Sequence, residues 1–517
     1  PVKDNELNAV IRIGQDFLNN YYEIKIPLKI TRTDSTINAA SIWPTQNNLS
    51  LALQDLIQLK LRRNGSFFPI GQIYREPHGN QTYSVLGNPN LAEVQGFLIG
   101  IENASSQTLS TEVWVNELRL SQIDEHGGWA ALGRVDLQLA DLGTLSVSAN
   151  TYTQGFGTIE QKANERARNN MLQFDAALNI DAGKLLPKKA GITIPVYASI
   201  NKTLLTPEYA PYDQDVTYKY KLANAGNRRD SVKNVAADET TIKTLNLTNV
   251  RFGQGAGKTK PWSISNFDFS YSFTKFDQTN PLILLNSISK HRFGMGYTFN
   301  GSSKFVQPFN KLIKNKSKWL SPVRDINFNY FPSLLSFRAD INRQFGKYTP
   351  RIVNTYDSKV ERVDTTYDKY FTFDRYYNLR WDLTRSLNLD FSATNFARVD
   401  EPFGLLDTKA KKDSVIKNFL KGGRTTLYQQ QSTISYNAPF AKLPATDWIT
   451  ARYSYSTSYK WIAASLLTPY LGNILENSQQ NNINGEFDFQ RLYSKSKFIT
   501  NITQPRDKED EDVSENN

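Results

Sequence analysis

The strongest constraint on the fold of this 517-residue chain is an alternation of apolar and polar side chains that recurs from residue 131 onward. Successive side chains of a β-strand point to opposite faces, so a period of two gives each strand one apolar and one polar face. The stretch from Ile449 to Trp461 shows it at its longest, with tyrosines on one face and serines on the other. The pattern predicts an all-β chain of about thirteen strands, near residues 131–140, 144–152, 171–182, 191–201, 243–253, 263–275, 290–300, 333–343, 375–384, 387–397, 425–437, 448–462 and 481–490.

The two faces of these strands differ in the way that the two faces of a transmembrane barrel differ. Each predicted strand has about ten residues, enough to cross a bilayer at a tilt of roughly 45°. The polar faces carry charged and amide groups, as a wet lumen does, and the side chains predicted to face the lumen are Asp175, Asn179, Asp181, Asn266, Asp268, Arg292, Arg338, Asp340, Arg380, Asp382, Arg452 and Lys460. The side chains predicted to face lipid are Phe174, Phe267, Phe269, Phe293, Phe337, Trp381, Tyr453 and Trp461. A large soluble β-sandwich with half-buried strands is the alternative that this pattern leaves open.

The connections between the predicted strands favour the barrel, because outer-membrane barrels alternate short periplasmic turns with long outer loops. The short connections are 141–143, 183–190, 254–262, 385–386 and 438–447, and the long ones are 153–170, 202–242, 344–374, 398–424 and 463–480. We interpret 301–332 as a periplasmic insert with a short lysine-rich helix at 311–320. An odd number of strands does not close a typical bacterial barrel, which predicts that the residues from 129 to 490 form part of a very large antiparallel transmembrane β-barrel.

Two flanking regions lack this regular succession of strands and connections. Residues 1–128 contain short apolar runs (21–30, 56–63, 94–103 and 111–120) separated by glycines, which predicts a β-sandwich-like domain. The parity of the connections predicts that this domain lies on the extracellular side. Residues 491–517 end in a run of charged residues, which predicts a periplasmic tail or linker that is disordered at its end.

The composition argues against catalytic chemistry. The chain has no Cys and three His, which excludes thiolate metal sites and cysteine nucleophiles and leaves little for histidine chemistry. We therefore predict no catalytic, metal or cofactor site and no enzymatic activity. Lys and Arg exceed Asp and Glu by 61 to 50, yet the positive residues are scattered, so we expect no nucleic-acid partner.

A glycine-rich stretch at Gly253–Thr259 superficially resembles a phosphate-binding loop. The Walker spacing requires glycine where Phe252 stands, and Pro261 and a strand follow instead of a helix. We therefore expect an ordinary turn. The three histidines, His78, His126 and His291, have no acidic residue at ligand spacing and are expected to be structural.

Several long stretches of the sequence resemble the SprA/Sov family. They are VWVNELRLSQIDEHGGWAALGRVDLQLAD (113–141), GFGTIEQKANERAR (155–168), LLPKKAGITIPV (185–196), RDINFNYFPSLLSFRADINR (324–343), FTFDRYYNLRWDLTRSLNLDFSATNFARVDEPFG (371–404) and DWITARYSYSTSYKW (447–461). The resemblance runs almost end to end, and family members are several times longer than this chain. It implies that the chain is an internal segment of one barrel.

The resemblance also implies a function. The family is the outer-membrane translocon of the type IX secretion system of Bacteroidetes, which is also linked to gliding motility, and it conducts folded cargo proteins that carry a C-terminal export domain. The implied partners are the remaining segments of the barrel, a PorV-like FadL-type barrel at a lateral opening, a periplasmic plug protein, and outer-membrane lipid or lipopolysaccharide. The alternatives are another outer-membrane barrel, such as a lipopolysaccharide-insertion or solute channel, and a secreted β-sandwich adhesin.

Overall fold

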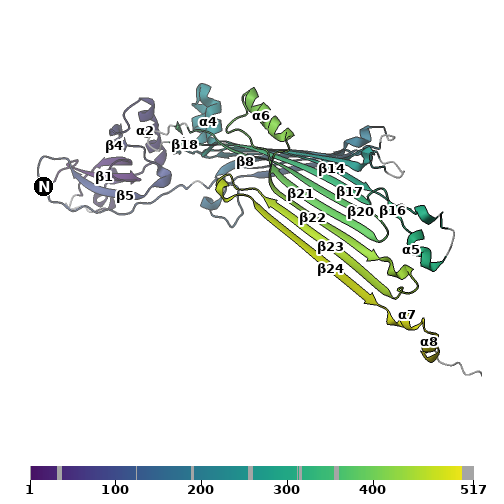
Figure 1. Cartoon of the computed structure of the whole chain (residues 1–517). Coiled ribbons are helices and arrows are strands. Elements are labelled where there is room, and N and C mark those ends of the chain that lie inside the picture. Colours follow the sequence, from purple (N-terminus) through teal and green to yellow (C-terminus); the bar gives the residue numbers. More distant parts are fainter. Residues whose placement is uncertain are drawn as a thin grey trace, which may run out of the picture.

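The computed structural model describes residues 2–31, 38–123, 125–187, 191–253, 260–310, 312–313, 317–353, 360–361 and 363–503. The chain forms an N-terminal domain followed by one long curved sheet (Figure 1). Residues 254–259 of the glycine-rich stretch, Lys311, residues 314–316 and the last fourteen residues of the predicted tail, 504–517, lie outside the described residues.

Thirteen antiparallel strands make up the long sheet of the described chain, and they neighbour one another in chain order. The strands are β6 (Ala130–Leu139), β7 (Gly143–Tyr152), β8 (Asn169–Asp181), β9 (Pro195–Pro207), β12 (Asp238–Arg251), β13 (Phe267–Thr279), β14 (Ile283–Asn300), β17 (Leu334–Pro350), β20 (Thr366–Asp382), β21 (Leu387–Arg398), β22 (Arg424–Ala438), β23 (Ile449–Ile462) and β24 (Ile474–Phe487). The predicted strand count and the antiparallel arrangement are confirmed. Over the described residues the sheet does not close on itself, and β6 and β24 are its two edges.

Several strands extend beyond the predicted bounds at one end of the sheet. The strand predicted at 290–300 begins at Ile283 as β14, and only residues 280–282 connect it to β13. The strand predicted at 375–384 begins at Thr366 as β20. At this end both faces carry polar side chains, so the alternation fades while the backbone ladder between β17 and β20 continues to Tyr348 and Thr366.

The connections, and the segment that follows β24, carry small elements at the ends of the sheet. These are β10 (Tyr209–Ala210), β11 (Asp213–Thr217), α3 (Tyr218–Ala223), α4 (Arg229–Ala236), β15 (Phe305–Val306), α5 (Ser321–Arg324), β16 (Phe328–Asn329), β18 (Ile352–Val353), β19 (Val360–Glu361), α6 (Lys409–Leu420), α7 (Phe489–Tyr493) and α8 (Lys497–Thr503). Helices α4 and α6 lie at the same end of the long strands as the N-terminal domain, and α5 and β16 lie at the opposite end (Figure 1). No helix in the described residues is both long enough and apolar enough to cross a membrane.

The connection between β14 and β17 is a single insert, as predicted. Ile326, Phe328 and Tyr330 alternate like a strand, but the strand ladder of Phe328 and Asn329 in the described residues is with Val306 and Phe305 of the same insert. The helix predicted at 311–320 is wrong for its described part, where residues 318–320 form a short 3-10 turn and α5 follows.

The N-terminal domain is one antiparallel sheet covered by a helix, so the predicted β-sandwich is wrong. Its strands are β1 (Leu7–Gly14), β2 (Tyr21–Pro27), β3 (Tyr74–His78), β4 (Gln81–Leu86) and β5 (Gly96–Asn103), in the order β3-β4-β2-β1-β5, and its helices are α1 (Ala39–Ile42) and α2 (Leu53–Gly65). Leu56 and Leu59 of α2 pack on Ile11, Ile24 and Val85 of the sheet. Burial of these side chains supplies the core of the domain.

Two predicted strands of this domain do not exist in the structure. Ile57, Leu59 and Leu61 give a false period of two, whereas the buried residues Leu56, Leu59, Lys60 and Arg63 have helical spacing. Residues 111–120 have a strand-like composition but pair with no other described strand and lie exposed. A strand needs a partner for its backbone groups, and composition alone does not supply one.

Candidate functional site: a two-faced curved sheet

The register of the long sheet separates the two predicted sets of side chains onto opposite faces. Paired residues of neighbouring strands share a face, so one row can be followed from strand to strand. Asp175 of β8 pairs with Asn201, and Asp268 of β13 pairs with Gly296, which pairs with Arg338. Followed through all the ladders, the strand residues predicted to face a lumen share one face, here called the polar face: Asp175, Asn179, Asp181, Asp268, Arg292, Arg338, Asp340, Arg380, Asp382, Arg452 and Lys460.

Asn266 is the exception. It lies just before β13, where its side chain is buried and donates to the carbonyl oxygens of Lys260 (2.8 Å) and Pro261 (3.1 Å). Asn266 therefore holds a turn together and is not presented on the polar face.

The residues predicted to face lipid all share the opposite face, here called the apolar face: Phe174, Phe267, Phe269, Phe293, Phe337, Trp381, Tyr453 and Trp461. Their rings pack across neighbouring strands, as between Phe267 and Tyr297 (5.0 Å) and between Phe337 and Tyr377 (5.2 Å). Trp381 and Trp461 lie at opposite ends of the sheet. The register thus separates the two sets, and their contact with lumen and lipid stays a prediction.

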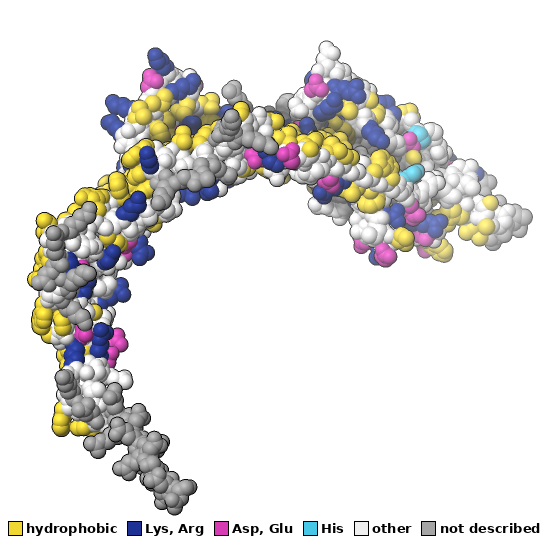
Figure 2. Space-filling view, turned by 90° about the vertical axis from the view of Figure 1, so that its right-hand side faces the viewer, with side chains coloured by type: hydrophobic (Ala, Val, Ile, Leu, Met, Phe, Trp, Pro, Cys, Tyr) yellow, Lys and Arg dark blue, Asp and Glu magenta, His cyan; other side chains and the backbone are white. Residues whose placement is uncertain are grey.

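The sheet curves so that the apolar face is the convex one. Figure 2 shows an arc in which hydrophobic side chains gather along the convex side, while charged and other polar side chains occupy much of the concave side. A sheet with this distribution of side chains can separate an apolar surrounding from an aqueous interior.

Several charged side chains on the polar face have polar or oppositely charged partners. Arg338 lies 2.8 Å from Asp340 on the same strand, and Lys460 of β23 lies 3.1 Å from Glu476 of β24. Asp382 accepts hydrogen bonds from the hydroxyls of Ser303 (2.8 Å) and Ser333 (2.6 Å). Where a cation and a carboxylate pair in this way, their charges offset each other within the face.

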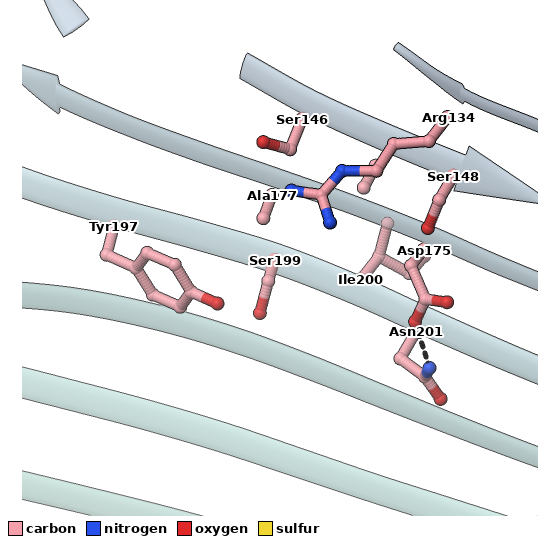
Figure 3. Close-up of a pocket in the computed structure, with 10 residues that line it drawn as sticks. Arg134, Ser146, Ser148, Asp175, Ala177, Tyr197, Ser199, Ile200 and Asn201 are labelled. Atoms are coloured by element: carbon pink, nitrogen blue, oxygen red, sulfur yellow. Dashed lines mark hydrogen bonds between the residues drawn. The ribbon is translucent and has the colours of Figure 1, made fainter. Parts of the chain in front are cut away.

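An open depression of about 280 Å³ lies on the polar face between β6 and β9. Arg134, Ser148 and Asp175 line it, and Asp175 accepts a hydrogen bond from the Asn201 amide (Figure 3). Among the described residues no three His, Asp or Glu side chains gather as metal ligands. The expected absence of a cofactor stays a prediction.

A buried joint fixes the N-terminal domain to the connection between β9 and β12. The Lys60 ammonium of α2 lies 2.8 Å from Asp213 and 3.0 Å from Asp215, and it also donates to the carbonyl of Pro89 (2.9 Å). The Tyr22 hydroxyl donates to Asp215 (2.8 Å). Lys60 is 1% exposed and Asp215 4%, so each charge depends on the other for compensation.

Burial of Tyr22, followed by the negative charge of Asp215, raises the pKa of the Tyr22 hydroxyl. The hydroxyl therefore stays protonated and remains a hydrogen-bond donor to the carboxylate. The sequence patterns did not predict this joint. Its one local signal is Lys60, a charged residue at a core position of a helical pattern.

Residues 1–222 match the family model SprA_N, described as a motility related/secretion protein. The matched stretch contains the N-terminal domain, the first four strands of the long sheet and both sides of the joint. No curated protein matches the chain.

We expect Lys60→Met to loosen the joint, because it leaves two carboxylates without their cation. The cost of breaking such a buried pair is about 3–5 kcal/mol. Limited proteolysis between residues 104 and 123 should become faster, and the triple variant that adds Asp213→Asn and Asp215→Asn should recover much of the protection. Lys25→Met is the matched control, since its partner Glu102 is 42% exposed and such surface pairs contribute about 0–1 kcal/mol. Unchanged cleavage in Lys60→Met contradicts the joint.

We also expect adjacent residues of β14 to differ in access to water. The chain has no Cys, so single cysteines in place of Arg292 and Phe293 are the only thiols present. In the membrane-inserted protein a membrane-impermeant thiol reagent should label Arg292→Cys and spare Phe293→Cys. Equal labelling of the two variants argues against the lumen and lipid assignment.

Proposed function

Because the chain belongs to the SprA/Sov family of motility- and secretion-related proteins, we propose that its long sheet forms part of the wall of a protein-conducting channel in the bacterial outer membrane. The channel exports folded cargo by type IX secretion. One observation carries the proposal: the register puts charged and amide side chains on the concave face of thirteen strands and aromatic side chains on the convex face.

The length of the strands supports a membrane position. Strand β23 has 14 residues, and at a rise of about 3.4 Å per residue it spans roughly 48 Å. At a tilt of roughly 45° this covers about 34 Å, slightly more than the hydrocarbon core of about 30 Å. The surplus places strand ends in the headgroup regions, where Trp381 and Trp461 lie at the two rims.

The size and chemistry of the polar face suit a conduit for folded proteins. Barrel diameter grows with strand number, and thirteen strands already exceed the eight whose interior is filled by side chains. Paired charges such as Arg338 with Asp340 give a wet wall with little net attraction for cargo. The conduit requires no chemical step, so we propose no enzymatic role.

The free edges of the sheet support the proposal that further strands pair with it along the wall. Strands β6 and β24 each pair on one side only in the described chain, and most of their side chains are exposed. A free strand edge in a bilayer leaves backbone groups unsatisfied, so further strands must complete the wall. We propose that these come from other segments of the same barrel. A PorV-like barrel, a plug protein and cargo are proposed as partners on the family resemblance alone.

The test of this function is depletion of the protein in the cell that makes it. Proteins with the C-terminal export domain should then fail to reach the surface, and expression of the intact gene should restore them. If these proteins still reach the surface while lipopolysaccharide is mislocalised, the chain belongs to a different outer-membrane machine.

The orientation of the sheet has a separate test. The joint holds the N-terminal domain at the end with the long connections, and we propose that this end is extracellular. A protease site inserted at Gly226, in the exposed turn between α3 and α4, should be cut on intact cells. The same site inserted at 140–142, between β6 and β7, should be cut only after the outer membrane is permeabilised. The opposite pattern reverses the orientation.

A further inference from the structure

The connection between β21 and β22, residues 399–423, folds back over the apolar face of the sheet. Val415 and Phe419 of α6 pack on this face, with the Phe419 ring 5.7 Å from that of Phe371 and 5.4 Å from that of Phe373. Both phenylalanines have the register of Trp381 in β20. The helix therefore lies against the convex face, at the end of the strands with the long connections (Figure 1).

The same connection covers cations of the apolar face. Arg343 lies 2.6 Å from Glu401, whose side chain is 5% exposed, and Lys369 donates to the carbonyl of Pro402 (2.8 Å). Arg375 donates to the carbonyl of Gly422 (3.1 Å). These contacts at both ends of the connection hold it against the sheet, so the side that faces away from the sheet is an ordered surface.

That outward side combines bare apolar side chains with lysines. Phe403 is 88% exposed, Leu420 76% and Ile416 55%. Ile416 and Leu420 lie one turn apart and form a second stripe, about 100° around the helix from the stripe that packs on the sheet. Lys409, Lys412 and Lys417 are exposed beside this second stripe, together with one carboxylate, Asp413, so the charge around the stripe is net positive.

We propose that α6 is a membrane-surface anchor that binds phosphorylated lipid headgroups. Ile416, Leu420 and Phe403 enter the boundary between headgroups and acyl chains, and the lysines pair with headgroup phosphates. A basic helix that presents large apolar side chains at the level where an apolar band ends has the composition of an interfacial helix. The charge of the patch selects an anionic surface as the occupant. The inference rests on the proposed position of the sheet in a membrane.

The absence of native cysteine makes a site-specific test possible. An environment-sensitive fluorophore is attached to Leu420→Cys in the full chain, reconstituted in phosphatidylcholine vesicles with or without phosphatidylglycerol. Emission should shift to shorter wavelength, and the probe should resist an aqueous quencher, more strongly in the anionic vesicles. Ser414→Cys is the matched control, because this exposed residue lies about 160° around the helix from Ile416 and should stay accessible to the quencher.

Two further variants separate the outcomes. Adding Lys409→Gln, Lys412→Gln and Lys417→Gln should abolish the difference between the two kinds of vesicle, and a difference that persists overturns the role of the lysines. The anchor is overturned if the quencher reaches the Leu420 probe as readily as the Ser414 probe. It is also overturned if protection of the Leu420 probe rises with protein concentration, because that indicates a contact between copies of the chain. A probe at Phe337→Cys reports on the wall itself: if it stays in water, the membrane proposal fails and the anchor fails with it. If the Phe337 probe lies in lipid while the Leu420 probe stays in water, the anchor proposal is wrong and the membrane proposal stands.

Discussion

The backbone hydrogen-bond ladder of the long sheet is the constraint on which the rest of the structure depends. Side chains alternate with a period of two, so a slip of one residue between neighbouring strands exchanges their faces. The ladders from β8 to β24 contain local register shifts only between β12 and β13, β14 and β17, and β21 and β22. Between these shifts the pairing is continuous, and the charged groups of distant strands, such as Asp175 and Lys460, share a face. The same ladder leaves β6 and β24 with unpaired outer edges in the described chain.

Charged side chains are handled in three different ways in this molecule. On the polar face they pair within or between strands, as Arg338 does with Asp340. Between the N-terminal domain and the sheet, Lys60 and Asp215 are buried together, which fixes the position of a domain that otherwise joins the sheet through an exposed stretch. On the apolar face, Arg343 is covered by a returning connection through Glu401. In each case the ionised group has a polar or charged partner, so it does not face an apolar surrounding alone.

The long sheet could be predicted because its signal is local. Alternation identified the thirteen strands, and it separated Arg292 from Phe293 onto the correct opposite faces of β14. The same signal failed in the N-terminal domain, where Ile57, Leu59 and Leu61 alternate inside a helix. It also failed at Asn266, whose position in a turn depends on carbonyl groups of Lys260 and Pro261. A period of two shows that a strand is possible, and hydrogen-bond partners decide whether it forms.

By itself the sequence determined that the chain contains many two-faced strands, which side chains share a face, and that no cysteine chemistry is present. Only the tertiary structure decided that the apolar face is convex, that a helix covers the N-terminal sheet, and that α6 lies on the outside of the long sheet. It alone brought Lys60 to Asp215, 155 residues away along the chain. The physical reason is that alternation depends on residues that are neighbours in the chain, whereas curvature and contacts between distant segments depend on how whole elements pack.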